Sequence, residues 1–206
     1  DEADVRSNGN SVGALRTREI LIVQDVTGSF SDEIGDARSA GLTLLDTVHE
    51  NGFPADKVGM VTFVSAAEAW TDLQRVEPNY SDIRSQWPTL DWCNRDYPPF
   101  TLPGFSEHFH SAPQMIDCRE GDTGGWADSG TNQGSGLEVA IEQLTDEATT
   151  EPTALKTIVL ISDGKAQCVP EGTVCDADVA AFGLEQANAA AAASISTFRV
   201  SCLLYP

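Results

Sequence analysis

Short apolar runs separated by amphipathic or irregular stretches are the most regular feature of this chain. Two of the runs, residues 20–23 and 155–161, are continuous, which is typical of strands buried on both faces of a parallel sheet. Residues 57–65 indicate a second buried strand, and residues 195–202 indicate a final strand. A fifth run, residues 68–76, alternates between apolar and polar positions. It indicates an edge strand that pairs antiparallel with the strand before it.

Between these runs, apolar residues recur at the three- and four-residue spacing of amphipathic helices. One helix should begin at Ser31 and stop at Asn51, a second should follow Asn132, and a third should extend from Asp176 to Ala193. The order is strand, helix, hairpin, irregular insert, helix, strand, helix, strand. It predicts an α/β fold with a doubly wound, mainly parallel sheet, one antiparallel edge strand, and helices on both faces.

Residues 78–128 break the regular pattern, because the prolines at positions 88, 98, 99, 103 and 113 interrupt any long helix or strand there. The aromatic residues that cluster in this stretch argue against disorder, and a long irregular stretch in a compact domain is usually functional. We therefore predict an ordered insert at about residues 91–128. Its His108 and His110 could hold a transition metal if the chain is extended there, although a histidine pair in a loop is more often incidental.

Size and charge narrow the possible functions. The 206 residues suffice for one domain with a sizeable core, which we place at residues 18–206 after a polar N-terminal arm, residues 1–17. Twelve basic and 32 acidic residues give a net charge of −20, which argues against binding to nucleic acid or to anionic lipid and favours attraction of cations. No apolar run is long enough to span a bilayer, so direct membrane insertion is not expected.

Five cysteines complete the composition, and none of them falls in a Cys-x-x-Cys pair, so a zinc site has little support. Cys168 and Cys175 flank a short loop that contains Pro and Gly, and Cys93 and Cys118 bracket most of the insert. We predict two local disulfides, with Cys202 left over, and hence an oxidising compartment outside the cytosol. Five reduced, mostly buried thiols are the alternative.

Each predicted disulfide, Cys93–Cys118 and Cys168–Cys175, closes an irregular loop and should stabilise the fold by about 2–4 kcal/mol. Peptide mapping under non-reducing conditions should recover these two pairs. Any other connectivity, or free thiols at the four positions, would contradict the prediction.

Polar residues follow two of the buried strands and precede one helix. Asp25, Thr27 and Ser29 come directly after the first strand, Thr131 lies in the SGTN stretch before the second helix, and Asp163 follows the strand that ends in ISDG. Open α/β sheets place their ligands at the carboxyl ends of parallel strands, so we expect these residues to converge. Hard oxygen donors suit Mg²⁺ or a similar cation. Alternatively, the hydroxyls cap helices and the aspartates bind backbone amides.

The stretch DVTGS resembles the metal-ion-dependent adhesion site of the von Willebrand factor A domain, whose signature is Asp-x-Ser/Thr-x-Ser. SGTN resembles the loop that supplies a threonine ligand in that family, and ISDG resembles the strand end that supplies a second aspartate. The three motifs occur in the family's order over residues 18–202. The resemblance implies a Rossmann-like fold and a site for Mg²⁺, or for Mn²⁺ or Ca²⁺, made by these five residues: Asp25, Thr27, Ser29, Thr131 and Asp163.

Two further implications come from this resemblance. The residues of the motifs are most similar to those of bacterial pilus-assembly (TadG-like) and other surface-exposed members of the family. The family usually continues with a further helix and strand beyond the strand that ends near Cys202, so we expect a truncated or variant domain. Thr27 stands where serine is commoner and keeps the hydroxyl.

For function, the resemblance implies a noncatalytic, adhesion-type module at a cell surface or outside the cell. A carboxylate from an Asp or Glu of a protein partner would complete the metal shell. Because the insert leads directly into the Thr131 loop, we expect it to shape the choice of partner. The alternative is a phosphotransferase of the haloacid-dehalogenase type with Asp25 as nucleophile. That family needs a downstream lysine and an acidic metal motif, which Lys165 and Asp163 match poorly.

Overall fold

The computed structural model describes residues 16–27, 30, 33–63, 67–87, 131–163 and 175–200, without the side chains of residues 175–178. Within these ranges the chain forms five strands and four helices. In chain order they are β1 (Arg18–Asp25), α1 (Ile34–Asn51), β2 (Lys57–Phe63), β3 (Ala67–Arg75), α2 (Val76–Gln86), α3 (Gln133–Thr145), β4 (Leu155–Ile161), α4 (Cys175–Ala192) and β5 (Ser196–Val200).

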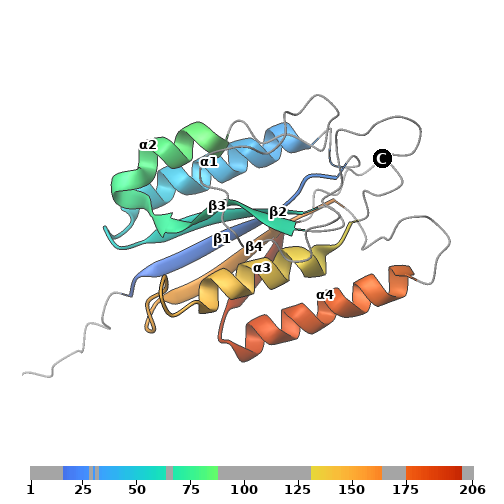
Figure 1. The fold of residues 1–206 in the computed structure, drawn as a ribbon. Helices are drawn as coiled ribbons and strands as arrows, with labels where there is room; N and C mark the ends of the chain where they lie inside the picture. The colour runs from blue at the N-terminus through green and yellow to red at the C-terminus, as the bar shows by residue number, and fades with distance from the viewer. Residues whose placement is uncertain are drawn as a thin grey trace, which may run out of the picture.

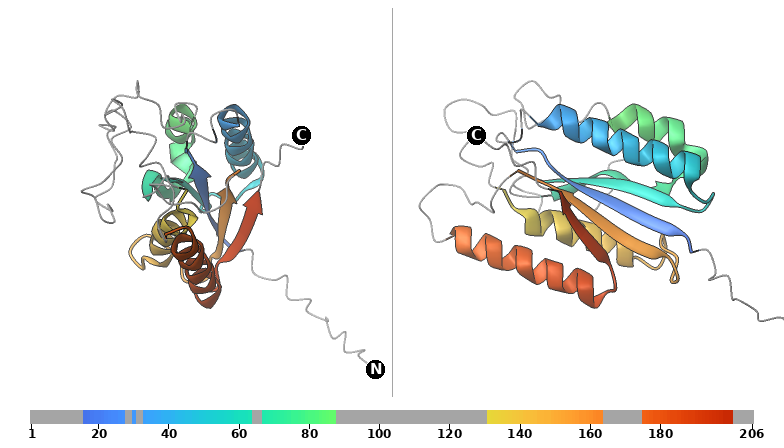
Figure 2. Two further views of the ribbon diagram at one scale, coloured as in Figure 1. Left: turned by 90° about the vertical axis from the view of Figure 1, so that its right-hand side faces the viewer. Right: turned by 180° about the vertical axis from the view of Figure 1, so that it is seen from behind.

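The strands form one sheet in the order β3-β2-β1-β4-β5. The pairs β1–β2, β1–β4 and β4–β5 are parallel, and β2–β3 is antiparallel with β3 at the edge. Helices α1 and α2 cover one face of the sheet, and α3 and α4 cover the other (Figures 1 and 2). This arrangement confirms the predicted doubly wound, mainly parallel α/β fold.

Strand β1 lies at the centre of the sheet and explains why its apolar run is continuous. Ile20 and Ile22 pack in the core under α1 and α2, while Leu21 and Val23 pack in the core under α3 and α4. Successive side chains of a strand point to opposite faces, so a strand covered on both sides needs apolar residues at consecutive positions. The carboxyl end of β1 is thereby held rigidly between two packed layers.

Helix α2 corrects the sequence prediction, which treated the chain as irregular from Pro78 onward. Glu77 has extended backbone angles, so the regular turns begin at Pro78. Proline suits the first turn of a helix, where its missing N–H has no helical partner to lose. Val76 and Ile83 are buried on the α1 side, and Trp87, just past the helix, is buried with its Nε1 donating to Thr71 Oγ1 at 3.2 Å.

The other element boundaries agree with the prediction to within a few residues, apart from ends that fall outside the described residues. The predicted insert at 91–128, most of the N-terminal arm and the predicted disulfides lie outside the described residues; Cys175 begins α4, but its side chain is not described. No helix in the described part of the chain is long and apolar enough to cross a membrane.

The two edges of the sheet differ. The first five residues of β3 are buried, whereas all five residues of β5 are exposed, including Phe198 at 60%. Near the end of β3 the pairing with β2 shifts register between Val58 and Met60. The side chain of Gln143, from α3, then accepts a hydrogen bond from the backbone N–H of Leu73 at 2.8 Å. Edge β3 is therefore closed by a helix side chain at this point.

Candidate metal-binding site

The turn after β1 is organised by the carboxylate of Asp25. Asp25 is completely buried, and its Oδ1 accepts hydrogen bonds from the Thr27 backbone N–H at 2.9 Å and from Thr27 Oγ1 at 2.7 Å. Both bonds are local, so the Asp-x-Thr spacing is what folds the turn back on the strand end. Thr27 is buried as well.

The end of β4 supplies the next contact. Ser162 Oγ donates to Asp25 Oδ2 at 2.6 Å, and Gln133 Nε2, from the first residue of α3, donates to Ser162 Oγ at 3.2 Å. The parallel register pairs Gln24 with Ile161, so the residue that follows each of them lies at the same level of the sheet. The hydrogen-bond chain Gln133–Ser162–Asp25 thus joins three segments that are far apart in sequence.

The loop before α3 shows which residue caps the helix. Asn132 is the N-cap, and its side chain accepts a hydrogen bond from the Ser135 backbone N–H at 3.1 Å. Thr131 is buried and lies one position earlier. The alternative that Thr131 serves as the helix cap is therefore wrong for this loop, since Asn132 has that role.

Burial is the main electrostatic influence on the carboxylate of Asp25. Burial raises the pKa of Asp25, and the negative charge of Asp163 raises this pKa further, while hydrogen bonds from Ser162 and Thr27 lower it. No cationic side chain is among the causes of this shift. A bound cation would supply the missing positive charge, and all the candidate ligands carry oxygen, which hard divalent cations prefer.

The described residues contain no cluster of three or more His, Cys, Asp or Glu side chains that could hold a metal. A cation here would therefore depend on hydroxyl oxygens as well as on Asp25 and Asp163. A donor set with few carboxylates and several hydroxyls is what the sequence predicts, and it stays a prediction.

The structure places the five predicted residues unequally. Asp25 and Thr27 are joined by hydrogen bonds, Asp163 is close enough to raise the pKa of Asp25, and Thr131 lies two residues before Gln133 of the hydrogen-bond chain. Ser29 lies outside the described residues. Their role as metal ligands stays a prediction.

Sequence reasoning missed Ser162 and Gln133. The signal for Ser162 was its position directly before Asp163, but its contact with Asp25 depends on the register between β1 and β4. The signal for Gln133 was weaker still, because a polar residue in the first turn of a helix is ordinary. Neither contact can be deduced without knowing how the strands align.

We expect Ser162→Ala to lower the free energy of unfolding by about 1.5–3 kcal/mol, because it removes a hydrogen bond to a buried carboxylate. Chemical denaturation measures the loss. Ser85→Ala is the matched control, since Ser85 is exposed and bonds only to the Asp82 carbonyl; its effect should stay within about 0.5 kcal/mol. Equal effects of the two variants would contradict the role given to Ser162.

Comparisons with known proteins agree with this fold. No protein-family model and no curated protein matches the sequence. Among solved structures, the chain is similar to the conserved hypothetical protein BatB from Bacteroides thetaiotaomicron (TM-score 0.57, 18% identity, 89% of this chain and 66% of that one). It is also similar to an aerotolerance-related membrane protein from Bacteroides fragilis (TM-score 0.54, 16% identity, 89% and 67%).

A third similar structure is proximal thread matrix protein 1 from the mussel byssus, described with a zinc-occupied MIDAS motif. The TM-score is 0.56 at 17% identity, over 90% of this chain and 38% of that one. This chain therefore has a fold of the von Willebrand factor A type. It spans about two thirds of the length of the two Bacteroides structures and a smaller part of the mussel protein.

Proposed function

We propose that this protein is a noncatalytic, metal-dependent protein-binding module of the adhesion type. The observation that carries the proposal is the convergence of three segments on the buried carboxylate of Asp25, through Thr27, Ser162 and Gln133. This convergence lies at the carboxyl ends of parallel strands, where folds of this class bind ligands. The mussel protein with the same type of fold has zinc in its MIDAS motif, which supports a divalent cation here.

In this proposal Asp25 and Asp163 supply negative charge, and Thr27, Ser29 and Thr131 supply hydroxyl oxygens. The cation would be Mg²⁺, or Mn²⁺ or Ca²⁺, and it would offer an electron-poor position to a carboxylate from an Asp or Glu of the partner. Without the ion, a chain of net charge −20 repels an acidic partner. We infer that the cation is required as a bridge.

The similar structures favour binding over the phosphotransferase alternative, because the mussel protein of this fold holds zinc in a MIDAS motif. The alternative also needs a downstream lysine and an acidic metal motif, which Lys165 and Asp163 match poorly. A location outside the cell or at its surface is supported by a membrane protein and a byssus matrix protein among the similar structures. Placement among TadG-like pilus proteins stays a prediction.

A divalent cation should stabilise the folded protein. If the cation binds only the folded form, the free energy of unfolding should rise by about 2.7 kcal/mol at a hundredfold excess over its dissociation constant. Thermal melts in EDTA and in millimolar Mg²⁺, Mn²⁺, Ca²⁺ or Zn²⁺ measure the shift. Thr131→Ala should reduce it, whereas Thr145→Ala, at the exposed far end of α3, should not. Melts that no cation moves would contradict metal binding.

Partner binding needs a separate test. Protein captured from native extracts by the wild type should be released by EDTA and should be absent with Thr131→Ala, while Thr145→Ala retains it. Deletion of residues 91–128 should change which protein is captured and leave the metal-dependent melting shift in place. Capture that survives both EDTA and Thr131→Ala would show that the contact lies elsewhere on the domain.

A further inference from the structure

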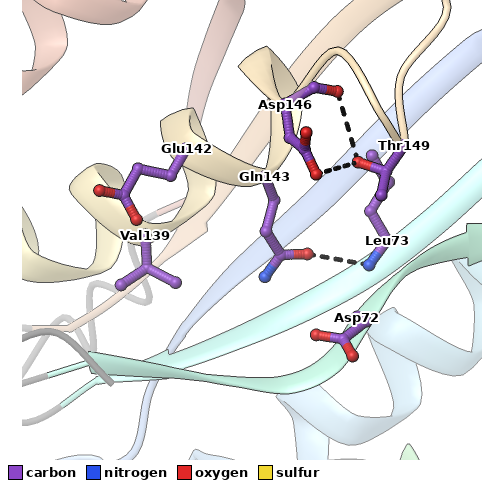
Figure 3. Close-up of a pocket in the computed structure, with 7 residues that line it drawn as sticks. All are labelled: Asp72, Leu73, Val139, Glu142, Gln143, Asp146 and Thr149. Carbon is purple, nitrogen blue, oxygen red and sulfur yellow. Dashed lines mark hydrogen bonds between the residues drawn. The ribbon is translucent and has the colours of Figure 1, made fainter. Parts of the chain in front are cut away.

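A second candidate site lies at the end of α3 that is opposite Thr131. It is an open pocket of about 430 Å³ between edge strand β3 and the C-terminal half of α3, with the loop that follows the helix (Figure 3). This volume is in the range of pockets that bind small molecules. The pocket is lined by Asp72, Leu73, Val139, Glu142, Gln143, Asp146 and Thr149.

Gln143 is the unusual member of this lining. Only 9% of Gln143 is exposed, and its Oε1 accepts from the backbone N–H of Leu73, which the register shift in β3 makes available. Its Nε2 is buried and has no hydrogen-bond partner. In Figure 3 this nitrogen is turned away from Leu73, toward the space between Val139 and Asp72. A buried donor without an acceptor is costly, so the pocket is incomplete until an oxygen atom meets it.

The rest of the lining favours a cationic ligand. Asp72, Glu142 and Asp146 contribute three carboxylates, and no lysine or arginine is among the described residues that line the pocket. Asp146 is held in place, because it accepts hydrogen bonds from the Ala148 backbone N–H at 2.9 Å and from Thr149 Oγ1 at 3.1 Å. A complementary ligand therefore combines a cationic group with a carbonyl oxygen for Gln143.

We propose that this pocket binds an arginine side chain of a partner protein, with a main-chain carbonyl of the same segment accepting from Gln143 Nε2. The aliphatic stem of arginine suits the apolar surface of Leu73 and Val139, and its planar guanidinium offers several donors to carboxylates at once. This contact is separate from the metal edge and needs no cation. It would give the module a second binding site, which prefers a cationic group, whereas the metal edge prefers a carboxylate.

The probe for this site is Nα-acetyl-L-arginine N-methylamide, titrated in EDTA and followed by ¹⁵N NMR. We expect saturable shifts of the Gln143 side-chain amide and of the Leu73 backbone amide. The citrulline analogue is isosteric and neutral, and spermidine is cationic but lacks the carbonyl, so both should bind more weakly. Equal binding of either compound would overturn the proposal, and so would the absence of a saturable shift at Gln143.

A matched pair of charge variants distinguishes binding in this pocket from nonspecific attraction of the probe to the acidic surface. Glu142→Gln changes an exposed residue that lines the pocket, and Glu147→Gln changes an exposed residue nearby that does not. The first variant should weaken binding of the arginine probe by about three- to fivefold, and the second should leave it unchanged. Equal affinities for the two variants would show that bulk charge alone attracts the probe and would overturn the proposal.

Discussion

Lys57→Met should lower the free energy of unfolding by about 3–5 kcal/mol, the largest single-site effect that we expect. Lys57 Nζ lies 2.9 Å from Glu19 Oε1, and the Glu19 side chain is fully buried between the central strands. Removal of the ammonium leaves that carboxylate buried and uncompensated. It also releases the loop after α3, because Lys57 Nζ donates to the Thr149 carbonyl and Glu19 accepts from the Glu151 N–H.

Denaturant titration of three variants tests this. Arg84→Met is the exposed counterpart, since the Arg84–Asp46 pair is largely in solvent at 3.1 Å; it should cost less than about 1 kcal/mol. The double variant Lys57→Met with Glu19→Gln should recover part of the loss, because it removes the stranded charge. If Lys57→Met costs no more than Arg84→Met, the buried pair does not hold the amino end of the sheet together.

The second large effect depends on pH. Glu68 is only 6% exposed, its Oε2 has no hydrogen-bond partner, and burial raises its pKa from 4.5 to about 7. Between these two pKa values the unfolded chain releases the Glu68 proton and the folded chain keeps it. The favourable contribution of Glu68 is therefore fully present below pH 4.5 and is lost as the pH rises through 7.

Glu68→Gln removes this titration. As the pH rises from 4 to 8, the wild type should lose about 2–3 kcal/mol more unfolding free energy than the variant. Each pH unit between the two pKa values is worth about 1.4 kcal/mol. The difference between the two proteins isolates Glu68 from the other carboxylates. The test is to measure the unfolding free energies of both proteins at intervals across this pH range. If the two free energies change with pH in parallel, Glu68 is not a buried ionisable residue.

The strands were predictable because a strand that is buried on both faces has apolar residues at consecutive positions. The continuous run that includes Ile20 and Val23 requires two covering layers, and the structure has them. Helix α2 was not predictable from the same rule, because its interpretation turned on Pro78, which acts as a breaker inside a helix and is tolerated at its start. The alternation in residues 68–76 indicated the edge position of β3 correctly but not the burial of Glu68.

The candidate site also has one part that was predictable from the sequence and one part that was not. The local part, Asp25 with Thr27, was predictable because a short spacing brings the two side chains together in any turn of this type. The non-local part was not predictable. Ser162 reaches Asp25 only through the register of β4 against β1, and Gln133 reaches Ser162 only through the position of α3. Sequence reasoning therefore supplied the predicted ligands and missed Ser162 and Gln133, which extend the hydrogen-bond chain from Asp25.

Anomalous diffraction from crystals of the wild-type protein grown with Mn²⁺ would locate the proposed cation. We expect one strong manganese peak at the carboxyl ends of β1 and β4, within direct or water-bridged contact of Asp25, Thr27 and Asp163. Crystals of Thr131→Ala, treated in the same way, should show a weaker peak. A strong peak somewhere else, or none at this edge under saturating Mn²⁺, would contradict a metal-dependent site in this protein.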